Sequence, residues 1–289
     1  MTAALVGLAV GAAIASLVRP VLAAEVVTRT NFRGNPIATA AGVVVILTVV
    51  AVEAVLAVVG TVVDDVDLRL DPGARLGVIV AVVGIGLFGL LDDLVGSRAT
   101  RGFRGHLLAL LRGRPTTGSW KLIGGGAVSL IAVSLADADV RDDPAALLRG
   151  AVVVALAANL GNLFDLAPAR TTKVATVAMV GLAVGAGWSE LAAPWSSDPA
   201  ASWGPFVVLG AAWALVPGEL GERWMLGDTG ANTIGAAAGL LAVLTLGATG
   251  ELVALAVVVV LNLASERISF SRVIAATPPL RWFDDLGRR

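Results

Sequence analysis

The sequence contains no cysteine and a single histidine, His106. These absences exclude disulfides, thiol nucleophiles, cysteine-ligated zinc and multi-histidine metal centres. Charged residues are also scarce, at 15% of the 289 residues, whereas 57% are hydrophobic. The net charge of −1 gives no indication of nucleic-acid binding. This composition is typical of a protein that is surrounded largely by lipid.

Apolar runs separated by charged or Pro- and Gly-rich breaks occur along the whole chain. A hydrocarbon core of about 30 Å needs roughly 20 helical residues per span. We therefore predict an all-α, polytopic transmembrane bundle of about nine spans, forming a single domain over residues 1–289. The predicted spans are residues 2–24, 37–63, 75–92, 121–137, 146–164, 173–188, 203–217, 229–247 and 250–265. The first run lacks the basic segment of a cleavable signal peptide, so we expect it to remain as a span.

Basic residues concentrate in alternate loops. The basic segments are 25–36, 93–120, 165–172, 218–228 and the tail 266–289. Of the 21 Lys and Arg residues, only Arg69, Arg75, Arg141 and Arg149 lie in or beside the other loops. Because Lys and Arg accumulate on the cytoplasmic side of membrane proteins, this pattern predicts an external N-terminus and a cytoplasmic C-terminus.

Four carboxylates lie at predicted span ends on the cytoplasmic side. Asp92 and Asp93 end the third span, Asp165 ends the fifth, and Asp228 begins the eighth. Ionised groups near hydrocarbon are costly and usually functional, and oxygen ligands from separate segments suit a hard divalent cation. Structural roles also remain open. The Asp pair could mark a helix end, Asp228 could cap a helix, and Asp165 near Pro168 could belong to a turn.

Asn159, Asn162 and Asp165 recur at intervals of three, which places them roughly on one face of the fifth span. Buried amides are costly unless they find partners. Hydrogen bonding between helices would account for them, and binding of a metal, a diphosphate or a nucleoside is the functional alternative.

The loop 93–120 is strongly basic and ends beside Lys121. Positive-inside bias and anionic headgroups account for most of such charge. A phosphate site built from Arg side chains and Lys121 is the alternative. Within the loop, residues 106–113 have the pattern of a short amphipathic helix lying on the membrane.

Together these segments resemble the polyprenyl-phosphate N-acetylhexosamine-1-phosphate transferase superfamily, which includes phospho-N-acetylmuramoyl-pentapeptide transferase and the GlcNAc-1-phosphate transferases. The similar segments are TRTNFRGNPIATAAG at 28–42, LLDD at 90–93, TGSWKL at 117–122, NLGNLFD at 159–165 and MLGDTGAN at 225–232. The resemblance implies transfer of a sugar-1-phosphate from a UDP-sugar to a polyprenyl phosphate, with release of UMP. It implies a multi-pass protein of the bacterial cytoplasmic membrane that serves cell-wall or surface-glycan synthesis.

The resemblance also assigns roles to residues. Asp228 would hold Mg²⁺ together with Asn162, and Asn159, Asn162 and Asp165 would bind substrate. The implied partners are the membrane, the polyprenyl phosphate and the UDP-sugar, and a homodimer remains open.

The remaining roles concern the acceptor lipid and the charge that develops during transfer. Either Asp92 or Asp93 would orient or deprotonate the lipid phosphate. Lys121 would offset the developing negative charge. Transfer of this kind depends mostly on positioning and charge neutralisation.

Two features depart from the family pattern and keep alternatives open. Asp165 is followed by residues 166–169 without a second acidic residue, and the tail 266–289 has no histidine where the family carries a His-rich motif. A relative that has lost catalysis and acts as a membrane scaffold or regulator is therefore one alternative. A transporter is another, although transporter sites usually lie near the bilayer midplane instead of at one face.

Overall fold

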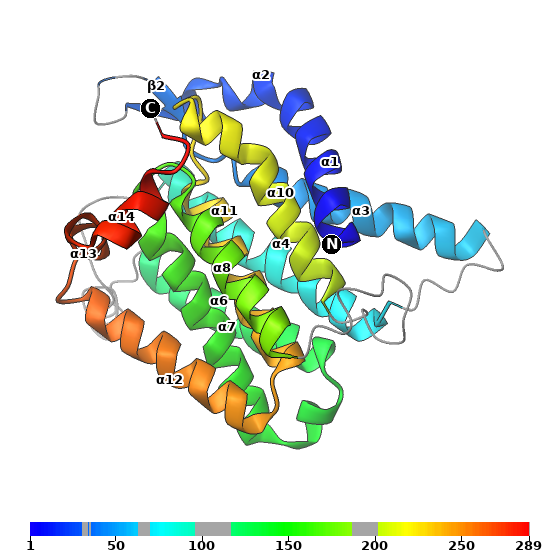
Figure 1. The fold of residues 1–289 in the computed structure, drawn as a ribbon. Helices are drawn as coiled ribbons and strands as arrows, with labels where there is room; N and C mark the ends of the chain where they lie inside the picture. Colours follow the sequence, from blue (N-terminus) through cyan, green and yellow to red (C-terminus); the bar gives the residue numbers. More distant parts are fainter. Residues whose placement is uncertain (31–33, 35, 63–69, 96–116, 187–201, 289) are drawn as a thin grey trace.

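The computed structural model describes residues 1–30, 34, 36–62, 70–95, 117–186 and 202–288. Within these residues the chain is mostly helical (Figure 1). The helices are α1 (Thr2–Leu17), α2 (Arg19–Leu22), α3 (Val43–Val62), α4 (Pro72–Val95), α6 (Thr117–Ala136), α7 (Pro144–Phe164), α8 (Arg170–Gly185), α10 (Trp203–Leu220), α11 (Gly227–Thr245), α12 (Ala248–Ser265), α13 (Phe270–Ala276) and α14 (Pro278–Asp285). Two short 3₁₀ helices, η1 (Glu25–Val27) and η2 (Asp139–Asp142), join them.

Six helices are long and apolar enough to cross a membrane, namely α3, α4, α6, α7, α10 and α12. Runs of Val, Leu and Ala form such helices because lipid offers the backbone no hydrogen-bond partners, so each N–H and C=O must bond within its own segment. α1 is a shorter apolar helix, and α8 and α11 lie at two further predicted spans without being among the six. The helical, multi-pass architecture agrees with the prediction. The count of nine spans and the side of each terminus remain predictions.

α11 occupies the centre of the bundle, between α4, α7 and α8 (Figure 1). Most of its residues are buried. Its first half is composed largely of Gly, Ala and Thr, which let neighbouring backbones approach closely in a membrane protein. By contrast α12 lies at the edge of the bundle and packs mainly on α7.

A small antiparallel hairpin departs from the predicted all-α architecture. β1 (Thr28–Thr30) pairs with β2 (Pro36–Ala38) in the loop predicted at 25–36. The Met225 N–H donates to the Ala38 carbonyl over 2.8 Å, which joins the hairpin to the segment before α11. Strands of three residues are too short to produce a recognisable alternation of apolar and polar residues, so no pattern predicted them.

The described parts of the predicted cytoplasmic loops gather at one end of the bundle. Arg29 of the hairpin donates to the carbonyls of Asp93 and Leu94 at the end of α4, over 3.4 and 3.3 Å. Arg288 of the tail donates to the carbonyl of Pro168, between α7 and α8. His106 and the predicted amphipathic helix at 106–113 lie outside the described residues.

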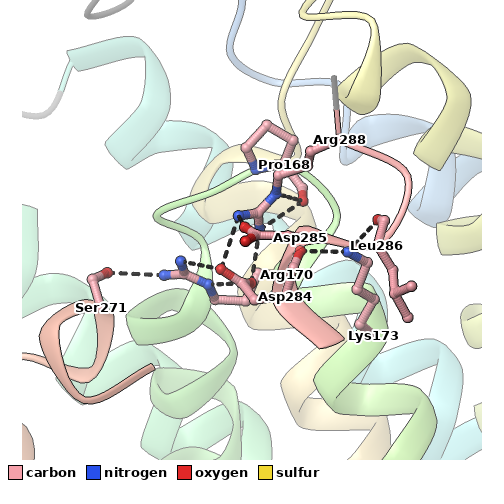
Figure 2. A network of polar contacts seen from close by, with 8 residues as sticks. All are labelled: Pro168, Arg170, Lys173, Ser271, Asp284, Asp285, Leu286 and Arg288. Atoms are coloured by element: carbon pink, nitrogen blue, oxygen red, sulfur yellow. Dashed lines mark hydrogen bonds and ion pairs between the residues drawn. The ribbon is translucent and has the colours of Figure 1, made fainter. Parts of the chain in front are cut away.

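The C-terminal tail is held at this end by a buried ion network (Figure 2). Asp284 of α14 accepts hydrogen bonds of 2.7 to 2.8 Å from Arg170 and from Arg288. Lys173 donates to the backbone carbonyls of Asp284 and Leu286 over 2.7 Å. Burial disfavours the ionised form of Asp284, but the hydrogen bonds from Arg170 and Arg288 outweigh it and lower the pKa to about 2. The network therefore fixes α14 to the start of α8.

Candidate functional site

A cavity of about 260 Å³ lies between α4, α6, α7 and α11, and the end of α12 borders it. Its polar lining side chains are those of Asp92, Lys121, Asn159, Asn162, Asp228, Asn232, Ser265 and Glu266. The rest of the wall is apolar, with Ile85 and Phe88 from α4, Gly125 and Gly126 from α6, and alanines from α7. The cavity thus joins a charged end to an apolar wall.

This cavity brings together five of the seven residues predicted for the site: Asp92, Lys121, Asn159, Asn162 and Asp228. Four helices contribute them, and each helix delivers its residue near the same end. The two remaining predicted residues, Asp93 and Asp165, do not line the cavity. Their carboxylates face backbone N–H groups at the start of α11.

Asp228 is the centre of the polar end. Its Oδ2 forms an ion pair with the Nζ of Lys121 and accepts a hydrogen bond of 3.2 Å from the Nδ2 of Asn162. The carboxyl group of Asp92 lies beside that of Asp228. The Lys121 and Asp228 side chains are 19% and 22% exposed, so an incoming ligand can reach both.

Asp93 is directed toward the backbone of α11. Its Oδ1 accepts from the Asp228 N–H over 2.9 Å, and its Oδ2 accepts from the Thr229 N–H over 2.9 Å and from the Thr229 hydroxyl over 2.6 Å. The residue before α11, Leu226, provides no side-chain cap. Asp93 therefore caps this helix from α4.

Asp165 follows α7 and lies behind Asp228. The Gly227 N–H faces its carboxylate. Burial, followed by the negative charges of Glu219, Asp228 and Asp93, raises the pKa of Asp165. The Asp165 side chain is not part of the cavity wall. Its contact with substrate remains a prediction.

Glu219 of α10 is a buried acidic residue that the sequence did not single out. Glu219 is 2% exposed, and its carboxylate faces the backbone N–H groups of Leu226 and Ala169. One of its oxygens, Oε2, has no hydrogen-bond partner among the residues that the structure describes. Glu219 follows the predicted end of its span at residue 217, so it was expected in a loop. Its position in the sequence gives no sign that the Glu219 side chain is buried.

Asn159 lines the cavity but also bonds to another helix. Its Nδ2 donates to the Oδ1 of Asn262 in α12 over 2.6 Å. The Nδ2 of Asn262 donates in turn to the carbonyl of Leu156 over 3.2 Å. The alternative in which Asn159 joins two helices is thus realised in the structure, and Asn262 is the partner that spacing did not reveal.

The oxygen donors around Asp228 fit a hard divalent cation. The carboxylate of Asp228 and the amide of Asn162 share one cavity wall. Across the described ranges, no group of three or more His, Cys, Asp or Glu side chains could hold a metal ion by itself. Mg²⁺ usually binds one or two carboxylates and takes further oxygens from substrate phosphates and water. The donor set therefore fits Mg²⁺ that is bound together with a phosphate substrate.

No protein-family model and no curated protein matches this chain.

Proposed function

We propose that this protein transfers a sugar-1-phosphate from a UDP-sugar to a polyprenyl phosphate at the cytoplasmic face of the bacterial membrane. One observation carries the proposal. Asp92, Lys121, Asn162 and Asp228, which come from four helices, line a single cavity that also has an apolar wall. The same four residues fall in the segments that resemble the transferase superfamily.

The proposed reaction transfers a sugar-phosphoryl group from the diphosphate of the UDP-sugar to the phosphate of the polyprenyl phosphate. An oxygen of the polyprenyl phosphate attacks the β-phosphorus of the UDP-sugar and forms a new P–O bond. The bond between the β-phosphorus and the bridging oxygen breaks, and UMP leaves with that oxygen and the electron pair. The products are a polyprenyl-diphosphate sugar and UMP. Catalysis of this kind depends mainly on orientation and on neutralisation of charge.

The polar end of the cavity supplies the groups that such a transfer needs. Asp228 and Asn162 would hold Mg²⁺, whose charge would offset that of the substrate phosphates. Lys121 would exchange its contact with Asp228 for a phosphate oxygen and would bind it as a point charge. Asp92 would orient the acceptor phosphate and accept a proton from it.

The apolar wall suits the polyprenyl chain of the acceptor. Gly125 and Gly126 of α6 line this wall, and a Cβ atom added at either position would meet no neighbouring part of the described chain within 4 Å. These glycines therefore do not serve close packing against a neighbouring helix. They leave room beside the charged end, where the isoprenoid nearest the phosphate would lie.

A catalytically inactive membrane scaffold is the second candidate. Specific observations favour it, since residues 166–169 include no second acid after Asp165 and the tail 266–289 has no histidine. The ion pair between Lys121 and Asp228 also satisfies both charges without a ligand. A transporter is less favoured because the charged groups of the cavity lie at one end of the bundle.

The deciding experiment follows UMP release by the purified chain in nanodiscs with undecaprenyl phosphate, Mg²⁺ and a panel of UDP-sugars. We expect UMP release that Asp228→Asn abolishes and that Asp92→Asn lowers strongly. Asp139→Asn is the matched control, because Asp139 is exposed in η2 at the opposite end of the bundle. If the folded wild-type chain releases no UMP from any donor, the transferase assignment is wrong and the scaffold is favoured.

A further inference from the structure

We infer that Asp93 is a positioning residue that fixes the first turn of α11, and that within the Asp92–Asp93 pair only Asp92 contacts substrate. The catalytic consequence of this inference rests on the proposed function. Its structural part does not, because it concerns contacts within the chain.

The hydrogen bonds of Asp93 leave little capacity for a ligand. Both carboxylate oxygens accept from the start of α11, at 2.9 Å from the backbone of Asp228, and at 2.9 and 2.6 Å from the backbone and hydroxyl of Thr229. The first N–H groups of a helix lack partners within the helix, and a carboxylate there also interacts favourably with the helix dipole. Asp93 therefore has the contacts of an N-cap supplied by another helix.

The backbones of α4 and α11 touch at this point. A methyl group at Gly89 of α4 would overlap the carbonyl of Asp228 and the nitrogen of Thr229. Gly227 has φ of +67°, and a methyl group there would overlap both the Thr39 carbonyl and the Asp93 carboxylate. Both glycines are needed for α11 to begin this close to Asp93. The close approach of the two backbones thus brings the start of α11 within reach of the Asp93 side chain.

Two further carboxylates support the same turn from behind. Glu219 of α10 faces the Leu226 N–H, and Asp165 faces the Gly227 N–H. With Asp93 on the next two N–H groups, four consecutive N–H groups from Leu226 to Thr229 face carboxylates of three other segments. The start of α11 is consequently held by carboxylates from three other segments of the chain.

This arrangement determines where the Asp228 carboxylate lies. The backbone N–H of Asp228 is held by Asp93, and its side chain meets Lys121 and Asn162 in the cavity. Asp92, one residue earlier on α4, lines that cavity. The two adjacent carboxylates therefore have separate tasks, and Asp93 acts on the reaction only through Asp228.

The test measures hydrogen–deuterium exchange in the segment 225–233 of the purified full-length chain. Asp93→Asn and the milder Thr229→Val are expected to speed exchange there by about tenfold, the usual effect of losing an N-cap. Thr229→Ser retains the hydroxyl and should restore the wild-type rate. Asp92→Asn should lower UMP release while leaving exchange in this segment unchanged.

A kinetic readout separates positioning from direct contact. Asp93→Asn should raise the Mg²⁺ concentration needed for half-maximal UMP release, because Asp228 moves, whereas Asp92→Asn should lower kcat at an unchanged Mg²⁺ requirement. The inference is overturned if Asp93→Asn leaves exchange at the wild-type rate, or if Asp92→Asn speeds it equally. A wild-type chain that releases no UMP would contradict the proposed function instead, and the exchange experiment would still decide the role of Asp93.

Discussion

The ammonium group of Lys121 in α6 is paired with the carboxylate of Asp228 in α11, 107 residues later in the chain. Lys121→Met keeps the length of the side chain but removes its charge. We expect UMP release to fall by about 100-fold or more, the usual effect of deleting one group that stabilises developing charge. Arg267→Met, at an exposed position of the tail, is the control. Release that is unchanged in Lys121→Met would contradict the assigned role.

The open space beside Gly126 predicts a specific effect on the acceptor lipid. Gly126→Leu would fill part of the cavity, and the chain should still fold because leucine favours helix by about 1 kcal/mol over glycine. We expect a raised KM for the polyprenyl phosphate with little change in the KM for the UDP-sugar. Gly181→Leu in α8 is the matched control, since Gly181 also borders open space but lies away from the cavity. An equal effect of both variants would contradict binding of the polyprenyl chain against the apolar wall of the cavity.

Ala169, the N-cap residue just before α8, has a left-handed backbone, at φ 60° and ψ 7°, and is fully buried. This conformation costs a residue with a Cβ atom roughly 1 kcal/mol, whereas glycine adopts it freely. We expect Ala169→Gly to stabilise the protein by about 0.5–1 kcal/mol in thermal or SDS unfolding. Ala167→Gly, two residues earlier, lacks this strain and should be neutral or destabilising. Destabilisation by Ala169→Gly would show that the methyl group contributes more by packing than it costs in strain.

Asp284 makes docking of the tail depend on pH. Its pKa is lowered from 3.8 to about 2 in the folded protein, so its contribution is present above pH 4 and is lost as the pH falls toward 2. A shift of this size corresponds to roughly 2 kcal/mol. Asp284→Asn should therefore release α14 already at pH 7.

The absence of cysteine provides the measurement. A single cysteine at the exposed Trp282 can carry a fluorophore whose anisotropy reports how firmly α14 is docked. We expect the anisotropy to fall between pH 4 and pH 2 in the otherwise wild-type chain, and to be low at pH 7 in the Asp284→Asn variant. Asp285→Asn is the control, because Asp285 is 60% exposed and its ion pair with Arg288 has a long separation of 3.6 Å. Equal anisotropy in all three chains at pH 7 would contradict the role of Asp284.

The sequence predicted where helices form more reliably than where they end. Each predicted span contains a helix, because an apolar run in lipid can satisfy its backbone in no simpler way. The observed helix ends differ from the predicted span ends where another segment of the chain pairs with the predicted span. The second span begins at Val43 and not at residue 37, since residues 36–38 pair with β1 and contact the loop before α11.

The candidate site was predicted in part. Asp92, Lys121, Asn162 and Asp228 were singled out from their segments, and the fold brings them to one cavity. Spacing could not predict that the partner of Asn159 is Asn262, because that hydrogen bond crosses between α7 and α12.

The sequence alone determined that this chain is a helical membrane protein without thiol chemistry, whose acidic and amide groups cluster at helix ends. These are local properties, since composition and run length suffice to select helices in lipid. Only the tertiary structure separated Asp92 from Asp93, and only it buried Glu219 against the start of α11. The direction of a carboxylate depends on which N–H group or cation of a distant helix lies opposite it, and no pattern within a single helix specifies that neighbour.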